Sequence, residues 1–235
     1  MIVDAIVILR AIRDGANHAG GVCSVSRGRT NRRRVSGTAH IPGADSRARE
    51  VLDFWFGRNL ELVPAVLQKR WFAGDPAFDA EVLTRFLALY REARWGGLVD
   101  WCQGPVRCLA YVILLDQFPR NMFRGSPMSF ESDPLAVVAA REAAARRFDK
   151  EVPPLGRAFF YLPFEHSEDL ADQDECARLF AQWPDEPALA TFNDYARRHR
   201  EVIARFGRFP HRNAVLGRSS TPEEIEFLRR PGSSF

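Results

Sequence analysis

The sequence predicts an all-α protein built as an array of antiparallel helical hairpins, with about nine helices. Apolar residues recur at helical spacing from residue 45 onward, and proline or glycine interrupts this pattern at short intervals. No segment shows the strict alternation of apolar and polar residues that is typical of a half-buried strand. Because short loops place consecutive helices side by side, we expect neighbouring helices to run antiparallel.

Length and composition agree with one large helical domain. The 235-residue chain is 46% hydrophobic and contains 18 Phe and 5 Trp, which is enough for a sizeable core. The longest uninterrupted apolar run covers residues 109–115, far short of the roughly 20 residues that a membrane helix needs. The four cysteines form no CxxC pair, which is typical of reduced thiols. We therefore expect a soluble, cytoplasmic protein with no membrane partner.

Residues 1–44 differ in character from the rest of the chain. Gly, Ser, Arg and Thr dominate this segment, and such a composition cannot bury enough apolar surface to become ordered. We predict a disordered leader over residues 1–44, followed by one all-α domain over residues 45–235. A start codon assigned too far upstream would explain the same composition. An arm that binds nucleic acid or an anionic surface is the alternative for the RTNRRR run at residues 29–34.

The predicted domain itself gives no sign of a nucleic-acid partner. Residues 46–235 hold 26 basic and 27 acidic side chains, so their net charge is close to zero. Domains that bind nucleic acid usually carry a basic face. We therefore expect no nucleic-acid partner for the folded part of the chain.

Capping residues and prolines predict where the first four helices begin. The fourth helix is the most apolar, so we expect it to be the central, buried one, and we expect Pro119 to end it. The four helices are predicted over residues 46–56, 64–72, 76–95 and 105–118.

The second half of the chain shows similar signals. Ser167 is a candidate cap for one helix, and Gly207 is a typical stop for the next. The sequence Thr221-Pro-Glu-Glu224 has the pattern of a capping box with a proline in the first turn. The five helices are predicted over residues 134–148, 154–161, 168–182, 187–206 and 222–230.

Three polar segments stand out against this helical background. They are LLDQFPRNMFRG at residues 114–125, LPFEHSED at residues 162–169 and RFGRFPHRNAVLGRSSTPEE at residues 205–224. The last segment places four arginines, one histidine and an asparagine between two helix signals. A turn that only reverses the chain direction does not need so many donors. We therefore predict that the three segments form one polar site.

We predict that this site binds a small anionic molecule or a peptide carboxylate. Arginine carries five donors and no acceptor, so a buried arginine needs a carboxylate or an anionic ligand. Arg120 and Arg212 would hold the anion, Asn121 and Asn213 would position it, and Glu165 would orient an arginine or histidine. The other ligand-binding candidates are Asp116, Gln117, Glu168 and Arg208.

Two other functions fit the same residues. In a hydrolase or lyase, His166 or His211 would act as general base beside Glu165, because histidine changes charge near neutral pH. The arginines would then stabilise developing negative charge. In a purely structural or partner-docking module, the same residues would clamp helix ends through buried ion pairs. His199 follows two arginines and precedes a third, which favours a solvated side chain.

The sequence favours neither a metal nor a cofactor. It contains no HExxH spacing, no P-loop and no GxGxxG motif. Glu165 and His166 are adjacent, so they cannot both point the same way from a helix toward a metal ion. We expect no metal or cofactor at this site.

The chain also resembles a known family. VLDFWFG at residues 51–57 and the three polar segments occur in an order that closely resembles the bacterial domain-of-unknown-function family numbered 924. The resemblance covers about residues 45–228. It implies a fold similar to tetratricopeptide (TPR-like) helical arrays, although the sequence shows no consensus repeat of about 34 residues. The resemblance implies no catalytic residues, so the candidate site depends on the residues alone.

Removal of residues 1–44 should leave the melting temperature of the protein nearly unchanged, because a segment of this composition adds little to a packed core. Thermal unfolding of the full chain and of the shortened chain compares the two directly. A drop of several degrees, equivalent to roughly 1 kcal/mol for a domain of this size, would show that the leader packs on the body.

Overall fold

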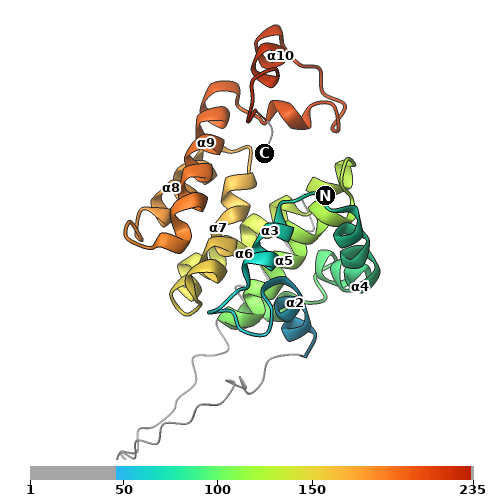
Figure 1. Cartoon of the computed structure of the whole chain (residues 1–235), viewed down its shortest axis with the longest axis vertical. Coiled ribbons are helices and arrows are strands. Elements are labelled where there is room, and N and C mark those ends of the chain that lie inside the picture. The colour runs from blue at the N-terminus through green and yellow to red at the C-terminus, as the bar shows by residue number, and fades with distance from the viewer. Residues whose placement is uncertain (1–45, 234–235) are drawn as a thin grey trace, which may run out of the picture.

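The computed structural model describes residues 46–233, so the predicted leader over residues 1–44 lies outside the described residues. Within the described part the fold is all-α, as predicted, with nine α-helices, five short 3₁₀ helices and no strand (Figure 1). None of these helices combines the length and apolar character that crossing a membrane requires. The α-helices are α2 (Ser46–Phe56), α3 (Ala65–Trp71), α4 (Pro76–Arg94), α5 (Pro105–Met122), α6 (Asp133–Ala145), α7 (Pro154–His166), α8 (Leu170–Phe180), α9 (Ala190–Phe206) and α10 (Pro222–Leu228).

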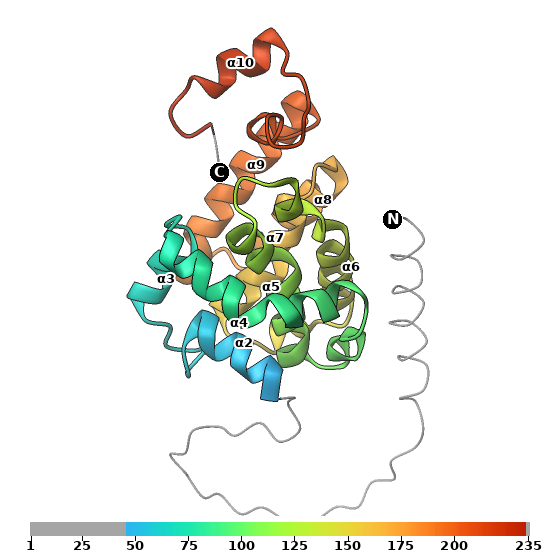
Figure 2. The same ribbon diagram turned by 90° about the vertical axis from the view of Figure 1, so that its right-hand side faces the viewer.

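Helix α5 is the central helix, as its apolar sequence predicts. Its side chains are buried almost without interruption from Cys108 to Met122. A helix that is apolar on all sides must be covered on all sides, and α5 packs against α2, α4, α6 and α7. Figures 1 and 2 show these helices around α5 from two directions. The polar end of α5 therefore has a fixed position relative to several other elements.

Consecutive helices from α4 to α9 pack against each other. Contacts join α4 with α5, α5 with α6, α6 with α7, α7 with α8 and α8 with α9. This pattern of neighbouring pairs is what short connections between helices favour. A TPR-like stacking of these pairs remains an expectation.

The chain after α9 projects from the end of the bundle, with α10 farthest from the core (Figures 1 and 2). Gly207 ends α9 in the left-handed conformation at φ 68°, as predicted for a helix stop. The predicted capping box opens α10, with Thr221 and Glu224 each accepting a hydrogen bond from the other's backbone N–H. We call residues 207–233 the C-terminal segment. It faces the polar ends of α5 and α7.

Pro119 lies inside α5 and does not end it, so that prediction was wrong. Proline has no N–H, so the carbonyl of Leu115 loses its usual donor four residues later. The hydroxyl of Ser132 replaces this donor, because Ser132 Oγ lies 2.6 Å from Leu115 O. The helix therefore continues to Met122, and Arg120 and Asn121 lie in its last turn.

Helix α7 is also longer than the sequence indicated. It was expected to end near residue 161, but it continues through Pro163 to His166. Asp169, not Ser167, caps the following helix by accepting a hydrogen bond from the backbone N–H of Ala171 at 2.9 Å. The polar segment at residues 162–169 is therefore the last turn of α7 and its connection to α8.

Replacement of Ser132 by Ala should lower the free energy of unfolding by about 1–3 kcal/mol, because it leaves the buried carbonyl of Leu115 without a donor. Urea denaturation measures the change. Thr84→Ala is the matched control, since the exposed Thr84 hydroxyl also donates to a helix carbonyl, that of Ala80 at 2.8 Å. Water can replace the Thr84 hydroxyl, so this control should stay within about 0.5 kcal/mol of wild type. Equal losses in the two variants would contradict the role given to Ser132.

Candidate functional site

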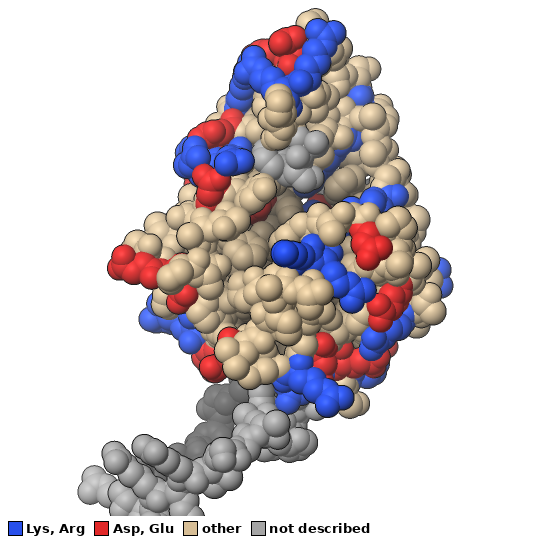
Figure 3. Space-filling view, in the orientation of Figure 1, with Lys and Arg blue, Asp and Glu red and all other residues tan. Residues whose placement is uncertain are grey.

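A hollow of about 280 Å³ lies where the polar ends of α5 and α7 and the middle of α9 meet the C-terminal segment. Figure 3 shows the surface hollowed between this segment and the helical body. The hollow brings together residues from all three polar segments that the sequence singled out. The predicted site residues that line it are Gln117, Arg120, Asn121, His166, His211 and Arg212.

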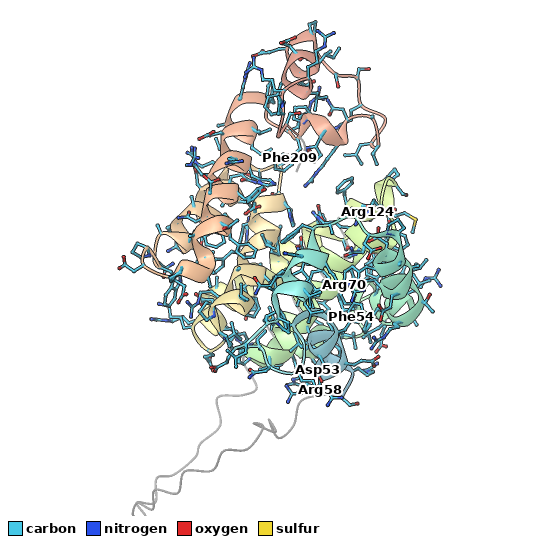
Figure 4. The ribbon with its side chains drawn as sticks, viewed as in Figure 1. Asp53, Phe54, Arg58, Arg70, Arg124 and Phe209 are labelled. Atoms are coloured by element: carbon cyan, nitrogen blue, oxygen red, sulfur yellow. The ribbon has the colours of Figure 1, made fainter. Side chains whose placement is uncertain are left out.

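Four polar side chains of the hollow come from the end of α5 and the turn after it: Gln117, Arg120, Asn121 and Arg124. The first three share one face of the helix because they are three and four residues apart, and Arg124 follows two residues after the helix ends. Asp79 of α4 holds two of them: Asn121 Nδ2 donates to it at 2.8 Å, and Arg124 donates to both its oxygens at 2.6 and 2.9 Å. Figure 4 shows Arg124 and Phe209 on opposite sides of the space between body and C-terminal segment.

Arg120 is fully matched by carboxylates and carbonyls. Its two terminal nitrogens donate to the two oxygens of Asp133 at 2.8 and 2.9 Å. One of these nitrogens also donates to the backbone oxygen of Asp116 at 2.5 Å. Asp133 is the first residue of α6, so this pairing fixes the end of α5 against the start of α6.

Arg212 is buried, but its guanidinium has few hydrogen-bond and carboxylate partners. Only 6% of its surface is exposed, its Nη1 lies 3.6 Å from Asp133 Oδ2, and its Nε has no hydrogen-bond partner among residues 46–233. Its guanidinium also stands over the rings of Phe130 and Phe209, at 4.6 and 4.5 Å from their centres. Burial, and then repulsion from Arg120, lower the pKa of Arg212 to about 10. Arg212 is therefore charged at neutral pH and shares its nearest carboxylate with Arg120.

His166 and Asp116 form a buried pair at the base of the hollow. His166 Nδ1 lies 2.7 Å from Asp116 Oδ1, and Gln117 donates to the other carboxylate oxygen at 2.5 Å. Burial opposes ionisation of Asp116, but neighbouring cationic groups and these hydrogen bonds lower its pKa to about 2. Burial lowers the pKa of His166. At neutral pH the pair is an ionised Asp116 that accepts the Nδ1–H of a neutral imidazole, which leaves Nε2 as the basic nitrogen of that ring.

Glu165 and His199 form a second buried pair behind the hollow. His199 Nδ1 lies 2.9 Å from the carbonyl of Tyr195 and 3.2 Å from Glu165 Oε1. Because a carbonyl can only accept, Nδ1 carries the proton. Burial raises the pKa of Glu165 well above its usual range and lowers that of His199 to about 3. The expectation that His199 is solvated was wrong: it is 5% exposed and its ring lines the hollow.

Three of the predicted ligand-binding residues lie outside the hollow and hold the C-terminal segment in place. Arg208 donates to both oxygens of Glu224 at 2.6 and 2.8 Å, and Asn213 Nδ2 donates to Ser220 Oγ at 3.0 Å. Glu168 accepts two hydrogen bonds from Arg218, at 2.6 and 2.9 Å. These side chains therefore have partners within the protein, and they do not line the hollow.

Several residues of the hollow were not predicted from the sequence. Arg124 had a signal, because it follows Arg120 by four residues in the same polar segment. The aromatic residues had none, since Trp and Phe are usually core residues. The unpredicted residues that line the hollow are Trp71, Phe72, Arg124, Gly125, Ser129, Phe130 and His199.

Hydrogen-bond donors line the hollow, and the carboxylates that pair with them lie farther from it. Asp79, Asp116 and Asp133 each accept from side chains that line the hollow, so their oxygens are already used. Arginine, asparagine, glutamine and neutral histidine side chains remain at its surface. Within the described part of the chain, no three His, Cys, Asp or Glu side chains are grouped to hold a metal ion. The arrangement is chemically suited to an anion.

Fold and site together define a helical protein with an arginine- and histidine-lined hollow, and comparison gives its family. The family model of a bacterial protein of unknown function (DUF924) matches residues 51–232, so the chain belongs to this family. It is also similar to the solved structure of the protein of unknown function ATU0120 from Agrobacterium tumefaciens, with 38% identity and a TM-score of 0.70. That match covers 78% of this chain and 97% of the other. No curated protein matches this chain.

His199 should make stability depend on pH. Its folded pKa of about 3 lies below the usual 6.5, so the unfolded chain takes up its proton first as the pH falls. Stability from this group is therefore complete above pH 6.5 and is lost toward pH 3, by up to about 1.4 kcal/mol per pH unit. In His199→Asn, the amide can keep the donation to Tyr195, and the loss between pH 6.5 and 4.5 should be smaller by up to that amount. Urea denaturation at a series of pH values measures both slopes, and identical slopes would contradict the buried, neutral state of His199.

Proposed function

We propose that the protein binds a small anionic ligand, or a peptide carboxylate, in the hollow between the ends of α5 and α7, the middle of α9 and the C-terminal segment. The observation that carries this proposal is the state of Arg212. A buried guanidinium is strongly unfavourable unless carboxylates and hydrogen bonds compensate it. Asp133 compensates Arg120 at hydrogen-bond distance but lies 3.6 Å from Arg212. An anion in the hollow provides the missing acceptor.

The neighbours of Arg212 support recognition of a carboxylate or phosphate group. Guanidinium donors match both groups with two parallel hydrogen bonds. Gln117 and Asn121 add amide groups to the same surface and His211 adds an imidazole. Burial lowers the pKa of His211 to about 4, so it meets the ligand as a neutral ring. The arginines provide the charge, and these neutral groups determine the orientation of the ligand.

A structural clamp accounts for part of the polar network but not for Arg212. The pairs of Arg120 with Asp133 and of Arg124 with Asp79 join α5 to α6 and to α4. Each of these pairs is complete by itself. Arg212 adds a second buried cation beside Arg120, and the repulsion between the two guanidinium groups argues against a clamp role for Arg212. This excess positive charge favours ligand binding over a purely structural role.

A second candidate function is a hydrolase or lyase, favoured by the hydrogen bond between Asp116 and His166. An ionised carboxylate that holds Nδ1–H orients the imidazole and stabilises the cation formed when Nε2 accepts a proton. The same ring lines the hollow beside Arg120 and Arg212, which would stabilise negative charge developing on a substrate. Of the two histidines considered as a general base, His166 has this carboxylate, whereas the charge of Arg212 helps to lower the pKa of His211.

Simple anions should stabilise the wild-type protein, and this effect should depend on Arg212. Phosphate and acetate, titrated at constant ionic strength with chloride as the reference, should raise the free energy of unfolding. A concentration a hundred times the dissociation constant should add about 2.7 kcal/mol. Arg212→Gln should lose this gain, because it removes the unmatched cation.

Arg197→Gln is the matched control for that experiment. Arg197 is an exposed arginine of α9 that pairs with Asp194 and Glu201 at the surface. The control should keep the full response to phosphate and acetate. The proposal fails if neither anion stabilises the wild type, or if Arg212→Gln responds as strongly as Arg197→Gln.

A further inference from the structure

The walls of the hollow are of two chemical kinds. Arg120, Arg212 and the imidazole rings supply nitrogen donors, and Trp71, Phe72 and Phe130 supply aromatic rings. The ring of Phe130 lies under the guanidinium of Arg212, whereas Trp71 and Phe72 come from the end of α3. A site for an inorganic anion alone has no need of the aromatic part. These three rings, which we call the aromatic wall, therefore indicate the chemistry of the rest of the ligand.

Phe72 has an exposed ring that directly follows a well-anchored residue. It follows Trp71, the last residue of α3, whose ring is anchored in the core. Trp71 Nε1 donates to Trp55 O at 2.8 Å, and its ring lies 4.8 Å from that of Phe159. The ring of Phe72 meets Trp71 and Phe192 only at larger separations, 6.2 and 6.4 Å, and its residue is 63% exposed. An exposed ring that lines a polar hollow is available to contact an apolar group of a ligand.

The size of the hollow also exceeds what a simple anion fills. Its volume of about 280 Å³ exceeds the roughly 150 Å³ of a protein cavity that accommodates benzene. A carboxylate or phosphate group against Arg212 occupies a small part of this space. The remaining volume can hold a larger group, and Trp71, Phe72 and Phe130 are among the residues that line it.

We infer that the ligand carries its anionic group on an aromatic ring, and that Phe72 contacts this ring while Arg212 holds the anion. This inference rests on the proposed anion site and names the class of ligand. A ring fits this wall better than an aliphatic group for two reasons. Aromatic rings gain from edge-to-face contact with Phe72 and Trp71. The guanidinium of Arg124, which lines the same hollow, attracts the face of a ring, as Arg212 already does with Phe130.

Calorimetric titration with paired probes tests this inference. Benzoate should bind the wild-type protein at least about tenfold tighter than acetate, and phenyl phosphate should exceed methyl phosphate by a similar factor, because each ring buries apolar surface. Cyclohexanecarboxylate has nearly the same size as benzoate but no aromatic ring. It should bind about threefold more weakly than benzoate.

Two variants test whether Phe72 causes the tighter binding of aromatic anions. Phe72→Ala should keep the affinity for acetate but lose most of the advantage of benzoate. Trp95→Ala is the matched control, because Trp95 also follows the last residue of a helix, α4, and is 73% exposed, but it does not line the hollow. This variant should behave as wild type.

The outcomes separate the ligand class from the anion site. If no probe binds, the proposed function itself fails. If acetate and benzoate bind equally, or if cyclohexanecarboxylate equals benzoate, the anion site stands and the aromatic ligand class is overturned. Retention of the full benzoate advantage in Phe72→Ala would overturn the role of Phe72. A loss shared with Trp95→Ala would do the same.

Discussion

The polar end of the bundle depends on one carboxylate, that of Asp133. It pairs with Arg120 of α5 at hydrogen-bond distance and is the nearest acid to Arg212 of the C-terminal segment. As the first residue of α6, Asp133 lies where the helix dipole favours a negative charge. Its neighbour Ser132 donates to Leu115 O, the carbonyl that Pro119 leaves without a partner. The residue that compensates the proline inside α5 therefore directly precedes the carboxylate that holds Arg120, so both contacts join α5 to the start of α6.

Much of the fold could be predicted from the sequence because its signals are local. Asp75 accepts a hydrogen bond from the N–H of Ala77 just before α4, and Gly207 ends α9, as their positions in the sequence indicate. The prediction that Pro119 ends α5 was wrong for a physical reason. The free-energy cost of a proline inside a helix can be offset when another donor binds the carbonyl that the proline leaves without one. That donor comes from Ser132, a residue 17 positions from Leu115. A rule limited to neighbouring residues cannot foresee such long-range compensation.

The candidate site could be predicted in outline but not residue by residue. Three polar segments do converge on one hollow, yet adjacent residues have different surroundings: Arg212 is buried against it, while Arg208 and Asn213 bind other parts of the C-terminal segment. The short 3₁₀ helix Pro210–Arg212 sends these side chains in different directions. The residue types alone do not predict the direction in which this helix turns. His199 did have a signal, because it follows Ala196 by three residues and precedes Val202 and Ile203 by three and four. All four share one buried face of α9.

The protonation states of the site explain why arginine, and not histidine, is its source of charge. Burial lowers the pKa of the histidines around the hollow, to about 3 for His199 and about 4 for His211. The same burial, together with Arg120, brings Arg212 only to about 10. Near neutral pH the enclosed imidazole rings are therefore neutral, while the guanidinium groups keep their charge. In an enclosed site, arginine can therefore supply the positive charge, while neutral histidine supplies directional hydrogen bonds. The hollow is lined by side chains of both kinds.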